Sequence, residues 1–392
     1  MRTMPTSRRV IVGLSGGVDS SVAALLLKQQ GHDVQALHMT NWDEDEEGYC
    51  NAAAELQDAR RLCEHLDIPL HHANFAPEYR ERVFADFLAE YRAGYTPNPD
   101  VLCNREIKFG VFRDYARRLG AEFIATGHYA RIDPGDAPAL LKGVDAAKDQ
   151  SYFLHAVAAE ALSRTLFPIG GLTKTEVRRI ARDHGLPSHA KQDSTGICFI
   201  GERPFRDFLS RYVQAEPGPI VDESGNEIGR HHGLAYYTPG QRQGLGIGGR
   251  REAADAPWYV AHRDFERNVL VAVQGADHPL LYSDRLIAES VHWIGGPPSA
   301  LAAGKPLRCQ AKVRYRQPDQ RCTVEQAGDD SLAVRFDHPQ RAVAPGQFAV
   351  FYEGDVCLGG GRIREASAAA ARKPRPAGGA GRTVIRSGII TG

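Results

Sequence analysis

A short run of small and acidic residues near the N-terminus has the composition of a phosphate-binding loop. Residues 15–20 read Ser-Gly-Gly-Val-Asp-Ser. The two glycines let backbone N–H groups approach a ligand closely, and a helix that begins here adds free donors and partial positive charge. Hydroxyl groups of Ser15, Ser20 and Ser21 add further donors. The pattern predicts that this loop binds phosphate.

Asp19 distinguishes this loop from the common ATP-binding loop, which requires Gly-Lys-Ser or Gly-Lys-Thr. No lysine lies within residues 13–21. A carboxylate beside a polyphosphate repels it unless a divalent cation lies between them. We therefore expect ATP with Mg²⁺ as its counter-ion, and Asp19 close to the metal-carried pyrophosphate. No metal site built from protein ligands is expected.

Two cysteines have surroundings that favour chemistry. Cys103 follows a proline-rich segment and precedes Arg105 and Lys108 near an expected helix start, and both features lower the pKa of a thiol. Cys198 lies in a loop of small residues. No two cysteines form a C-x-x-C pair, and the odd count argues against a disulfide framework. We expect the remaining five to be inert packing residues: Cys50, Cys63, Cys309, Cys322 and Cys357.

Alternating apolar strands and amphipathic helices position these residues in the N-terminal half. The alternation predicts an α/β fold with a doubly wound parallel sheet. In such sheets ligands bind at the carboxyl ends of the strands, so this edge is expected to gather residues 14–20, Met39, 98–103 and 127–128. The expected strands span 8–14, 33–38, 70–75 and 122–126, and the expected helices span 21–30, 52–66, 78–91 and a segment after Arg105 that ends near 119.

The C-terminal half has a different texture. Turn clusters and short β-like runs at 234–237 and 258–261 predict a small β-rich domain. Evenly spaced runs between 284 and 365 predict a compact β-barrel. The last residues are rich in Ala, Arg, Pro and Gly and are expected to be disordered. The predicted division is a catalytic domain over 1–215, a central domain over 216–282, a barrel over 283–366 and a basic tail over 367–392.

Composition sets broad bounds on function. The formal net charge is zero, so the chain as a whole is not a generic polyanion binder. Charged residues make up 24% and hydrophobic residues 42%, as in ordinary soluble proteins. No run approaches the ~20 apolar residues of a membrane span, and no signal-peptide core precedes the first strand. We expect a cytoplasmic protein without a membrane partner.

Several motifs extend the argument beyond the loop. The hexapeptide resembles the PP-loop of ATP pyrophosphatases, which split ATP between its α and β phosphates and adenylate a substrate. From residue 9 to about 365 the chain resembles the bacterial tRNA-specific 2-thiouridylases. The matching stretches are G-L-S-G-G-V-D-S at 13–20, N-P-D at 98–100, L-C-N at 102–104, T-G-H-Y-A-R at 126–131, K-D-Q-S-Y-F-L at 148–154, G-I-C-F-I at 196–200, T-P-G-Q-R at 238–242 and R-Y-R-Q at 314–317.

The resemblance implies a sulfurtransferase. Its reaction would adenylate the C2 oxygen of the wobble uridine and then transfer sulfur from a cysteine persulfide, giving 2-thiouridine, AMP and pyrophosphate. The implied partners are tRNAs of the Lys, Glu and Gln type and a persulfide sulfur-donor protein. Cys103 would be the nucleophile and Cys198 the persulfide carrier. Asp100 would move protons beside the base, although a turn-capping role remains open.

The resemblance also implies binding residues. Those for the target base are Asn98, Pro99 and Asp100. Those for ATP are Gly13, Leu14, Ser15, Gly16, Gly17, Val18, Asp19, Ser20, Met39 and Gly127. Those for tRNA are His128, Lys148, Asp149, Gln150, Arg314, Tyr315 and Gln347. Basic residues at alternating strand positions would meet RNA phosphates: Lys312, Arg314, Arg316 and Arg321.

Two other functions use a similar loop. An amide-forming PP-loop synthetase needs an amine source and no cysteine pair. A non-catalytic nucleotide- or RNA-binding module needs neither Cys103 nor Cys198. The pair of loop cysteines favours the sulfurtransferase.

Overall fold

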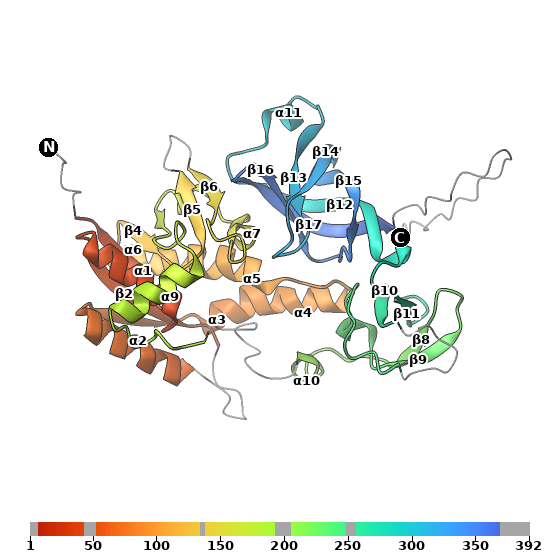
Figure 1. Ribbon diagram of the computed structural model, residues 1–392, viewed down its shortest axis with the longest axis horizontal. Helices are drawn as coiled ribbons and strands as arrows, with labels where there is room; N and C mark the ends of the chain where they lie inside the picture. The colour runs from red at the N-terminus through yellow and green to blue at the C-terminus, as the bar shows by residue number, and fades with distance from the viewer. Residues whose placement is uncertain (1–6, 43–51, 134–137, 193–204, 248–255, 369–392) are drawn as a thin grey trace.

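The computed structural model describes residues 7–42, 52–133, 138–192, 205–247 and 256–368 (Figure 1). Its N-terminal half contains a five-stranded sheet in the order β3-β2-β1-β4-β7, and every strand pairing in it is parallel. The predicted doubly wound α/β fold is confirmed. The strands are β1 (Arg9–Gly13), β2 (Asp33–Thr40), β3 (Leu70–Asn74), β4 (Phe123–Ala125) and β7 (Thr165–Leu166).

Helices cover both faces of this sheet because its strands are apolar on both sides. Val10 and Val12 belong to one core cluster with helices α1, α2 and α9, whereas Ile11 belongs to a second cluster with the helices between residues 76 and 118. Successive strand residues point to opposite faces, so β1 lies buried between two helix layers. The first layer comprises α1 (Val18–Gln29), α2 (Ala52–Leu66) and α9 (Lys174–Asp183).

The second layer is built from two long helices, each with a π-helical segment in the middle. The first runs through α3 (Ala76–Tyr79), η1 (Arg80–Phe84) and α4 (Ala85–Arg92). The second runs through α5 (Pro99–Leu102), η2 (Cys103–Val111) and α6 (Phe112–Arg118). The prediction that this helix begins after Arg105 is wrong. It begins at Pro99, because a proline in the first helical turn gives up no hydrogen bond.

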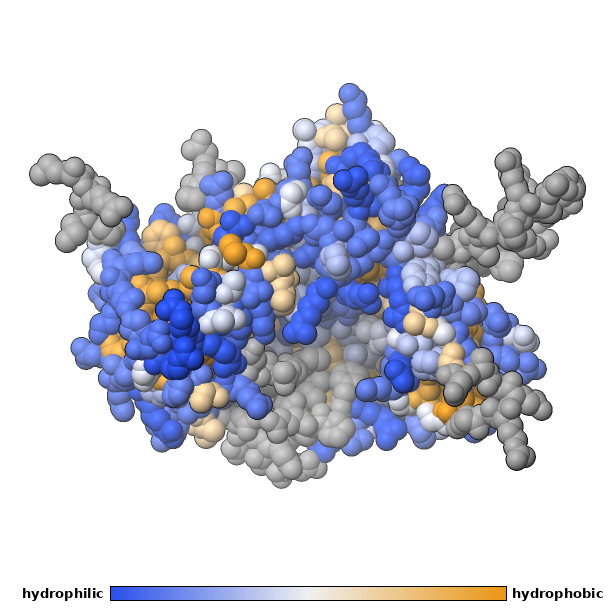
Figure 2. Space-filling view, in the orientation of Figure 1, coloured by the Kyte–Doolittle hydropathy of each residue, from blue (hydrophilic) through white to orange (hydrophobic). Residues whose placement is uncertain are grey.

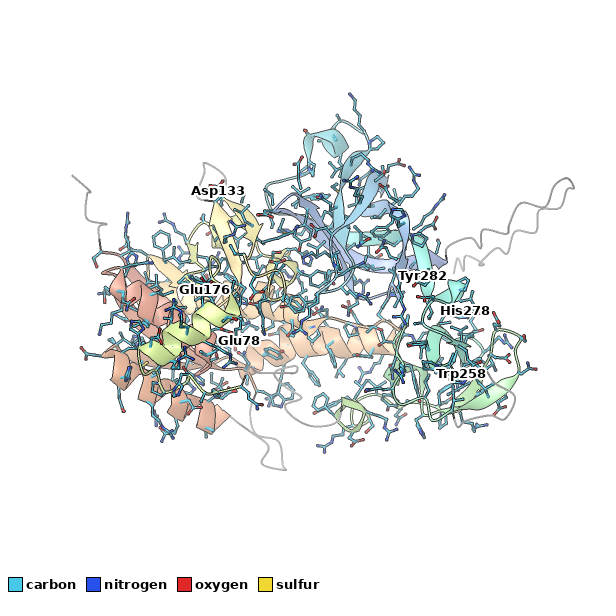
Figure 3. The ribbon with its side chains drawn as sticks, in the orientation of Figure 1. Glu78, Asp133, Glu176, Trp258, His278 and Tyr282 are labelled. Carbon is cyan, nitrogen blue, oxygen red and sulfur yellow. The ribbon has the colours of Figure 1, made fainter. Side chains whose placement is uncertain are left out.

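Shorter elements connect the sheet to the rest of the chain. Thr173 and Glu176 form a capping box at the start of α9, where Figure 3 labels Glu176. The remaining elements of this part are β5 (Ala130–Asp133), β6 (Ala139–Lys142), α7 (Ser151–Leu154), α8 (Ala159–Leu162) and α10 (Phe205–Leu209).

The central region folds around a four-stranded sheet in the order β10-β11-β8-β9. The strand expected at 258–261 is present as β10, which contains Trp258 (Figure 3). The prediction of a strand at 234–237 is wrong, because Leu234–Tyr236 form the 3₁₀ helix η3. Gly233 precedes this helix with a φ of 129°, which suits a turn. The strands are β8 (Gly218–Val221), β9 (Glu227–His231), β10 (Trp258–Asp264) and β11 (Val269–Gln274).

The C-terminal region is a closed antiparallel barrel, as predicted. Its strands follow the order β12-β15-β14-β13-β16-β17, and β17 pairs back with β12. Sequence reasoning missed β12. The elements are η4 (Pro279–Leu281), β12 (Tyr282–Trp293), α11 (Ser299–Ala302), β13 (Leu307–Lys312), β14 (Gln320–Gly328), β15 (Ser331–Arg341), β16 (Phe348–Glu353) and β17 (Val356–Ala368).

Two boundaries differ from the predictions. Arg314 and Arg316 do not lie on a strand, because β13 ends at Lys312 and the chain turns before β14. The tail does not begin at 367, because Ser367 and Ala368 pair with β12 as part of β17. The rest of the predicted disordered tail, 369–392, and the loop that carries Cys198 lie outside the described residues.

The barrel is joined directly to the N-terminal half. Strand β17 pairs with β6, so the β5–β6 hairpin extends the barrel sheet. The face in Figure 2 is mainly hydrophilic over the barrel and α9. No helix among the described residues is long and apolar enough to span a bilayer.

Candidate nucleotide and tRNA site

The predicted phosphate loop connects β1 to α1 at the edge where the parallel strands end. Strand β1 lies between β2 and β4, so the chain order reverses here, which is where open α/β sheets bind ligands. Gly16 has a φ of 74°, and a Cβ atom there would lie 2.9 Å from Cβ of Asp58 on α2. A Cβ atom on Gly127 would lie 2.7 Å from the Ser20 backbone nitrogen. Glycine at both positions lets α2 and the end of β4 pack closely against the loop.

The loop serines differ in their exposure and in their hydrogen bonds. Ser21 is fully buried; its hydroxyl donates to the Gly17 carbonyl (2.7 Å) and accepts from Ser188 (2.8 Å). The buried Ser20 hydroxyl also donates to the Gly17 carbonyl, at 3.1 Å. Ser15 is exposed. Of these three, only Ser15 presents its hydroxyl to solvent, whereas Ser20 and Ser21 shape the loop. Gly17, the N-cap residue of α1, makes no side-chain capping bond, so the backbone donors of the first turn remain available.

Asp19 is held by two groups that sequence reasoning missed. Lys174 Nζ lies 2.7 Å and 2.8 Å from the two carboxylate oxygens, and the Tyr129 hydroxyl donates to Oδ1 at 2.8 Å. Lys174 offsets the charge of Asp19 in this structure, so a divalent cation is not the only group that can do so, and Mg²⁺ at this loop stays a prediction. Lys174 is placed by its backbone N–H, which donates to Asp145 (2.9 Å), and by the capping box immediately before it.

The end of β2 borders the same loop. His38 Nδ1 lies 2.9 Å from the Leu14 carbonyl oxygen, which ties β2 to the first loop residue. Burial lowers the pKa of His38, so its imidazole is neutral near pH 7. Met39 follows, partly exposed, and packs against the apolar cluster beneath the sheet. The predicted ATP residues Gly13 to Ser20, Met39 and Gly127 thus share one edge of the sheet.

Cys103 does not lie in a loop, contrary to the prediction. It is the first residue of the π-helical segment η2 and is buried. π-Helical insertions are frequent at functional sites. The π-helical segment η2 is therefore the structural feature that indicates a functional role for the helix of Cys103. Cys198 lies outside the described residues, so of the two predicted reactive cysteines only Cys103 can be placed in the structure.

Asp100 of the predicted base site and His128 of the predicted tRNA site are both close enough to Lys108 to feel its charge. Burial raises the pKa of Asp100, and the charge of Lys108 partly opposes this rise. Burial, followed by Lys108, lowers the pKa of His128 well below its ordinary value. The His128 ring lies 6.0 Å from each of the Phe109 and Phe167 rings. His128 is therefore a neutral imidazole in an aromatic setting, next to the strand end that carries Gly127.

Asn98 meets the barrel. Its side-chain amide donates to Gln347 Oε1 (3.3 Å), and Gln347 Nε2 donates to the Thr96 carbonyl (2.9 Å). Pro99 lies in the first turn of α5. Asn98, which is predicted to contact the base, and Gln347, which is predicted to contact tRNA, thus join the barrel to the helix that carries Cys103.

The Lys-Asp-Gln motif lies at a second joint. The buried Asp149 accepts hydrogen bonds from the backbone of Gly143 and Ser151, both at 3.1 Å, and forms an ion pair with Lys312 of β13 (3.0 Å). These bonds engage Asp149 and Lys312 within the protein, and contacts of these two side chains with RNA stay a prediction.

Gln150 and Lys148 complete this joint. Gln150 Oε1 accepts a hydrogen bond from the Tyr129 backbone N–H at 3.0 Å. Tyr129 is also the residue whose hydroxyl binds Asp19. The Tyr315 hydroxyl donates to the Lys148 carbonyl at 3.2 Å. Arg314 is exposed in the turn after β13. Lys148, Arg314 and Tyr315 therefore lie at one surface of the joint.

Comparison with known proteins identifies the family. The tRNA-specific 2-thiouridylase MnmA of Alcanivorax borkumensis is 58% identical over 366 residues, covering 93% of this chain and 100% of that protein. This chain belongs to the tRNA-specific 2-thiouridylase family. The 2-thiouridylase MnmA of Pseudomonas aeruginosa (strain UCBPP-PA14) is 59% identical and covers 93% of this chain and 96% of its own.

Domain profiles and solved structures add detail to this thiouridylase assignment. The profile described as "tRNA methyl transferase HUP domain" matches residues 8–202, the "tRNA methyl transferase PRC-barrel domain" matches 206–274, and the "Aminomethyltransferase beta-barrel domain" matches 283–363. The U34-tRNA thiolase NcsA of Methanococcus maripaludis is 18% identical, with 48% of this chain and 60% of that chain covered and a TM-score of 0.33. A likeness at that level supports no further conclusion.

Proposed function

We propose that this protein converts the wobble uridine of tRNA to 2-thiouridine at the expense of ATP. The uridine O2 attacks the α-phosphorus of ATP, the α–β phosphoanhydride bond breaks, and pyrophosphate leaves. Sulfur then attacks C2 and displaces AMP. The observation that carries this proposal is the 58% identity, across the whole length of a curated relative, to a tRNA-specific 2-thiouridylase.

The loop and Lys174 would bind the triphosphate. Backbone N–H groups at the start of α1 would donate to phosphate oxygens, as helix N-termini do. Lys174 Nζ, which is bound to Asp19 at this loop, would offset the charge that develops on the leaving pyrophosphate. Asp19 would keep the lysine in position until ATP binds. Mg²⁺ would accompany ATP as its counter-ion, and the partly exposed carboxylate of Asp19 is the acidic group of the loop that fits such an ion.

Sulfur delivery would use Cys103 and Cys198. In this step the Cys103 thiolate attacks the inner sulfur of a Cys198 persulfide, and the terminal sulfur leaves as hydrosulfide. Hydrosulfide attacks C2 of the adenylated uridine and displaces AMP. A Cys103–Cys198 disulfide remains, and an external thiol must supply two electrons before the next cycle. The persulfide would come from a donor protein.

The RNA would lie between the helix of Cys103 and the barrel. Asn98, Pro99 and Asp100 would contact the target base, with the neutral His128 as an aromatic platform. Lys148, Arg314, Tyr315 and Gln347 would contact the rest of a tRNA of the Lys, Glu or Gln type. Asp149 and Gln150 would act indirectly, by fixing the barrel to the sheet. In this arrangement residues 1–215 form the catalytic domain, residues 216–282 a central domain and residues 283–366 a barrel that positions the RNA. The reaction would take place in the cytoplasm.

One assay separates the candidate functions. The protein is incubated with ATP, unmodified tRNA and a sulfide source, and both AMP and the nucleosides of the digested tRNA are measured by mass spectrometry. A thiouridylase yields AMP and 2-thiouridine. An amide-forming synthetase yields AMP only when its own carboxylate substrate and an amine are added, and it yields no thiolated nucleoside. A binding module yields neither product under any of these conditions.

A further inference from the structure

A second pair of thiols lies in the barrel, away from the site described above. Cys309 on β13 and Cys322 on β14 are direct partners in the antiparallel register. Their Sγ atoms are 3.8 Å apart. Cys309 is partly exposed, whereas Cys322 is fully buried. The expectation that both are isolated packing residues is therefore incomplete.

The backbone geometry of this pair suits a disulfide. Residues directly opposite each other on antiparallel strands have Cα atoms about 4.5–5.5 Å apart, and disulfides span Cα separations of about 4.4–6.8 Å. Closing the S–S bond requires side-chain rotation and little backbone movement. Arg308 reinforces this register, because its guanidinium donates to Thr323 on β14 and to Asp337 on β15, at 2.8–2.9 Å.

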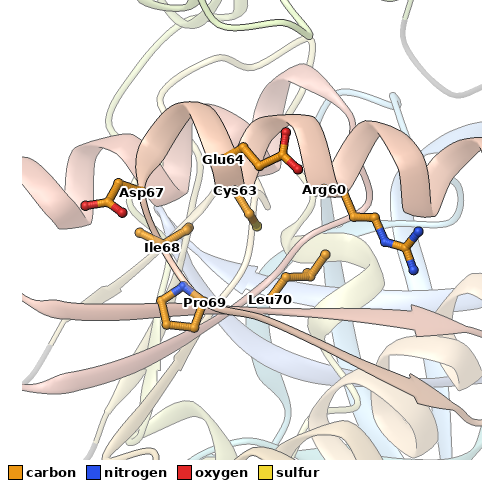
Figure 4. Close-up of a pocket in the computed structure, with 7 residues that line it drawn as sticks. All are labelled: Arg60, Cys63, Glu64, Asp67, Ile68, Pro69 and Leu70. Carbon is orange, nitrogen blue, oxygen red and sulfur yellow. The ribbon is translucent and has the colours of Figure 1, made fainter.

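Two other cysteines provide internal controls. Cys357 is buried in the barrel and its sulfur lies 4.0 Å from the Ser151 carbonyl oxygen. Cys63 lies beside a cavity of about 400 Å³ between α2 and β3 (Figure 4), and burial raises its pKa to about 11. Within the described ranges, neither has a sulfur contact of the kind that joins Cys309 and Cys322.

We propose that Cys309 and Cys322 form a redox-active dithiol that closes to an intramolecular disulfide with a low-molecular-weight disulfide such as oxidised glutathione. The accessible Cys309 thiolate attacks one glutathione sulfur, and the first glutathione thiol leaves. Cys322 then attacks the Cys309 sulfur of the mixed disulfide, and the second glutathione leaves. Two electrons pass from the protein to glutathione, and the two thiol protons end on the two glutathione thiols.

The site constrains one hairpin of the barrel. The pair lies near the turn that connects β13 to β14 and carries Arg314 and Tyr315. A disulfide here would link the two strands at the base of that turn. It would also lower the conformational entropy of the unfolded chain, which stabilises the folded barrel. The dithiol chemistry does not depend on the proposed thiolation reaction. A result that contradicts one of these two proposals therefore does not contradict the other.

The test is peptide mapping after exposure of the full-length protein to oxidised glutathione. Free thiols are blocked by alkylation, the protein is digested without reductant, and linked peptides are identified by mass spectrometry. We expect a peptide pair joined through Cys309 and Cys322, while Cys63 and Cys357 remain alkylated. Full alkylation of both barrel cysteines after treatment, or linkage of Cys309 to a different cysteine, overturns the proposal.

Single variants test the order of the two steps. Cys322→Ser should accumulate glutathione on Cys309, because the resolving thiol is missing. Cys309→Ser should leave Cys322 reduced, because that sulfur is buried. Glutathione on Cys322 at a rate equal to that on Cys309 contradicts the order. Cys309→Ala provides the same comparison if serine impairs folding, and oxidised wild type should melt at a higher temperature than the oxidised Cys309→Ala protein.

Discussion

Two aspartate–lysine pairs connect distant parts of this chain, and they differ in how they face solvent. Asp19 and Lys174 meet at the phosphate loop, with 32% and 12% of their side chains exposed. Asp149 and Lys312 meet at the joint between sheet and barrel, with 3% and 11% exposed. Both aspartates belong to motifs for which the family resemblance implies ligand contacts. Burial separates them: the first remains open to a ligand, and the second is enclosed.

The partners of the two aspartates reinforce this difference. Among the described residues, the side chains of Tyr129 and Lys174 hold Asp19, and side chains can turn toward a bound triphosphate. Two backbone N–H groups and a largely enclosed lysine hold Asp149, and backbone donors are less free to turn away than side chains. We therefore expect the loop pair to affect catalysis with little effect on stability, and the joint pair to affect stability first.

Breaking the loop pair should have the largest effect. Lys174→Ala or Asp19→Ala should slow AMP formation by about 10²–10³-fold or more, because a charge placed at the leaving pyrophosphate is lost. The melting temperature should change little. Asp183→Asn, on the exposed face of α9 where Asp183 pairs with Arg179 (3.2 Å), is the matched control and should retain full activity. AMP release at the wild-type rate in both loop variants would remove the pair from the mechanism.

Breaking the joint pair should mainly destabilise the fold. Lys312→Ala leaves Asp149 buried without its cation and should cost about 3–5 kcal/mol of the free energy of unfolding. The double variant Lys312→Met with Asp149→Asn should recover part of this loss, which denaturant titration can measure. Asp337→Asn, which breaks the exposed pair with Arg308, should cost far less, because solvent screens that pair. An equally small cost for Lys312→Ala would contradict the structural role of the joint.

Acid should weaken the joint as well. His155 lies beside Phe348 at this joint, and burial lowers its pKa to about 4 from 6.5. Between these values the unfolded chain binds a proton that the folded chain does not, so stability falls as pH falls from about 6.5 to 4. A shift of this size corresponds to about 3 kcal/mol. Unfolding measured across this range should show a weaker pH dependence in His155→Gln than in wild type; equal slopes would exclude His155 as the cause.

Removing residues 369–392 should have the smallest effect. This segment follows the last residue paired in β17 and carries Arg372, Lys373, Arg375, Arg382 and Arg386 without an acidic residue. Unfolding free energy should change by less than about 0.5 kcal/mol, with at most a small loss of tRNA affinity at low salt. A truncation that also removes Ser367 and Ala368 shortens β17 and is the informative comparison. A large loss of stability in the shorter deletion would show that the barrel needs the tail.

The sequence was most informative where function depends on neighbouring residues. The loop at 15–20, the capping box at Thr173 and the alternation of strands and helices are local patterns, and each is present in the structure. Partners distant in sequence were missed. Lys174 is 155 positions from Asp19, and Lys312 is 163 positions from Asp149, so no local spacing indicates either pair.

Other errors have local causes. The helix start was placed after Arg105 because Thr96 to Asp100 is rich in turn residues, although Pro99 in fact occupies the first helical turn. Strand β12 was missed because Asp284, Arg285 and Glu289 interrupt its apolar pattern, and its residues pair on both sides with β15 and β17. The Cys309–Cys322 contact depends on strand register, which single-strand patterns do not specify.

The most direct test of the proposed function follows labelled sulfur from a donor-protein persulfide into tRNA, with AMP measured in the same reaction. We predict that Asp19→Ala acquires label on Cys198 but forms neither AMP nor 2-thiouridine. We predict that Cys103→Ser binds ATP and tRNA and also acquires label on Cys198, yet makes no 2-thiouridine. Labelled 2-thiouridine at the wild-type rate from either variant, or label that settles on one of the other five cysteines, would contradict the account.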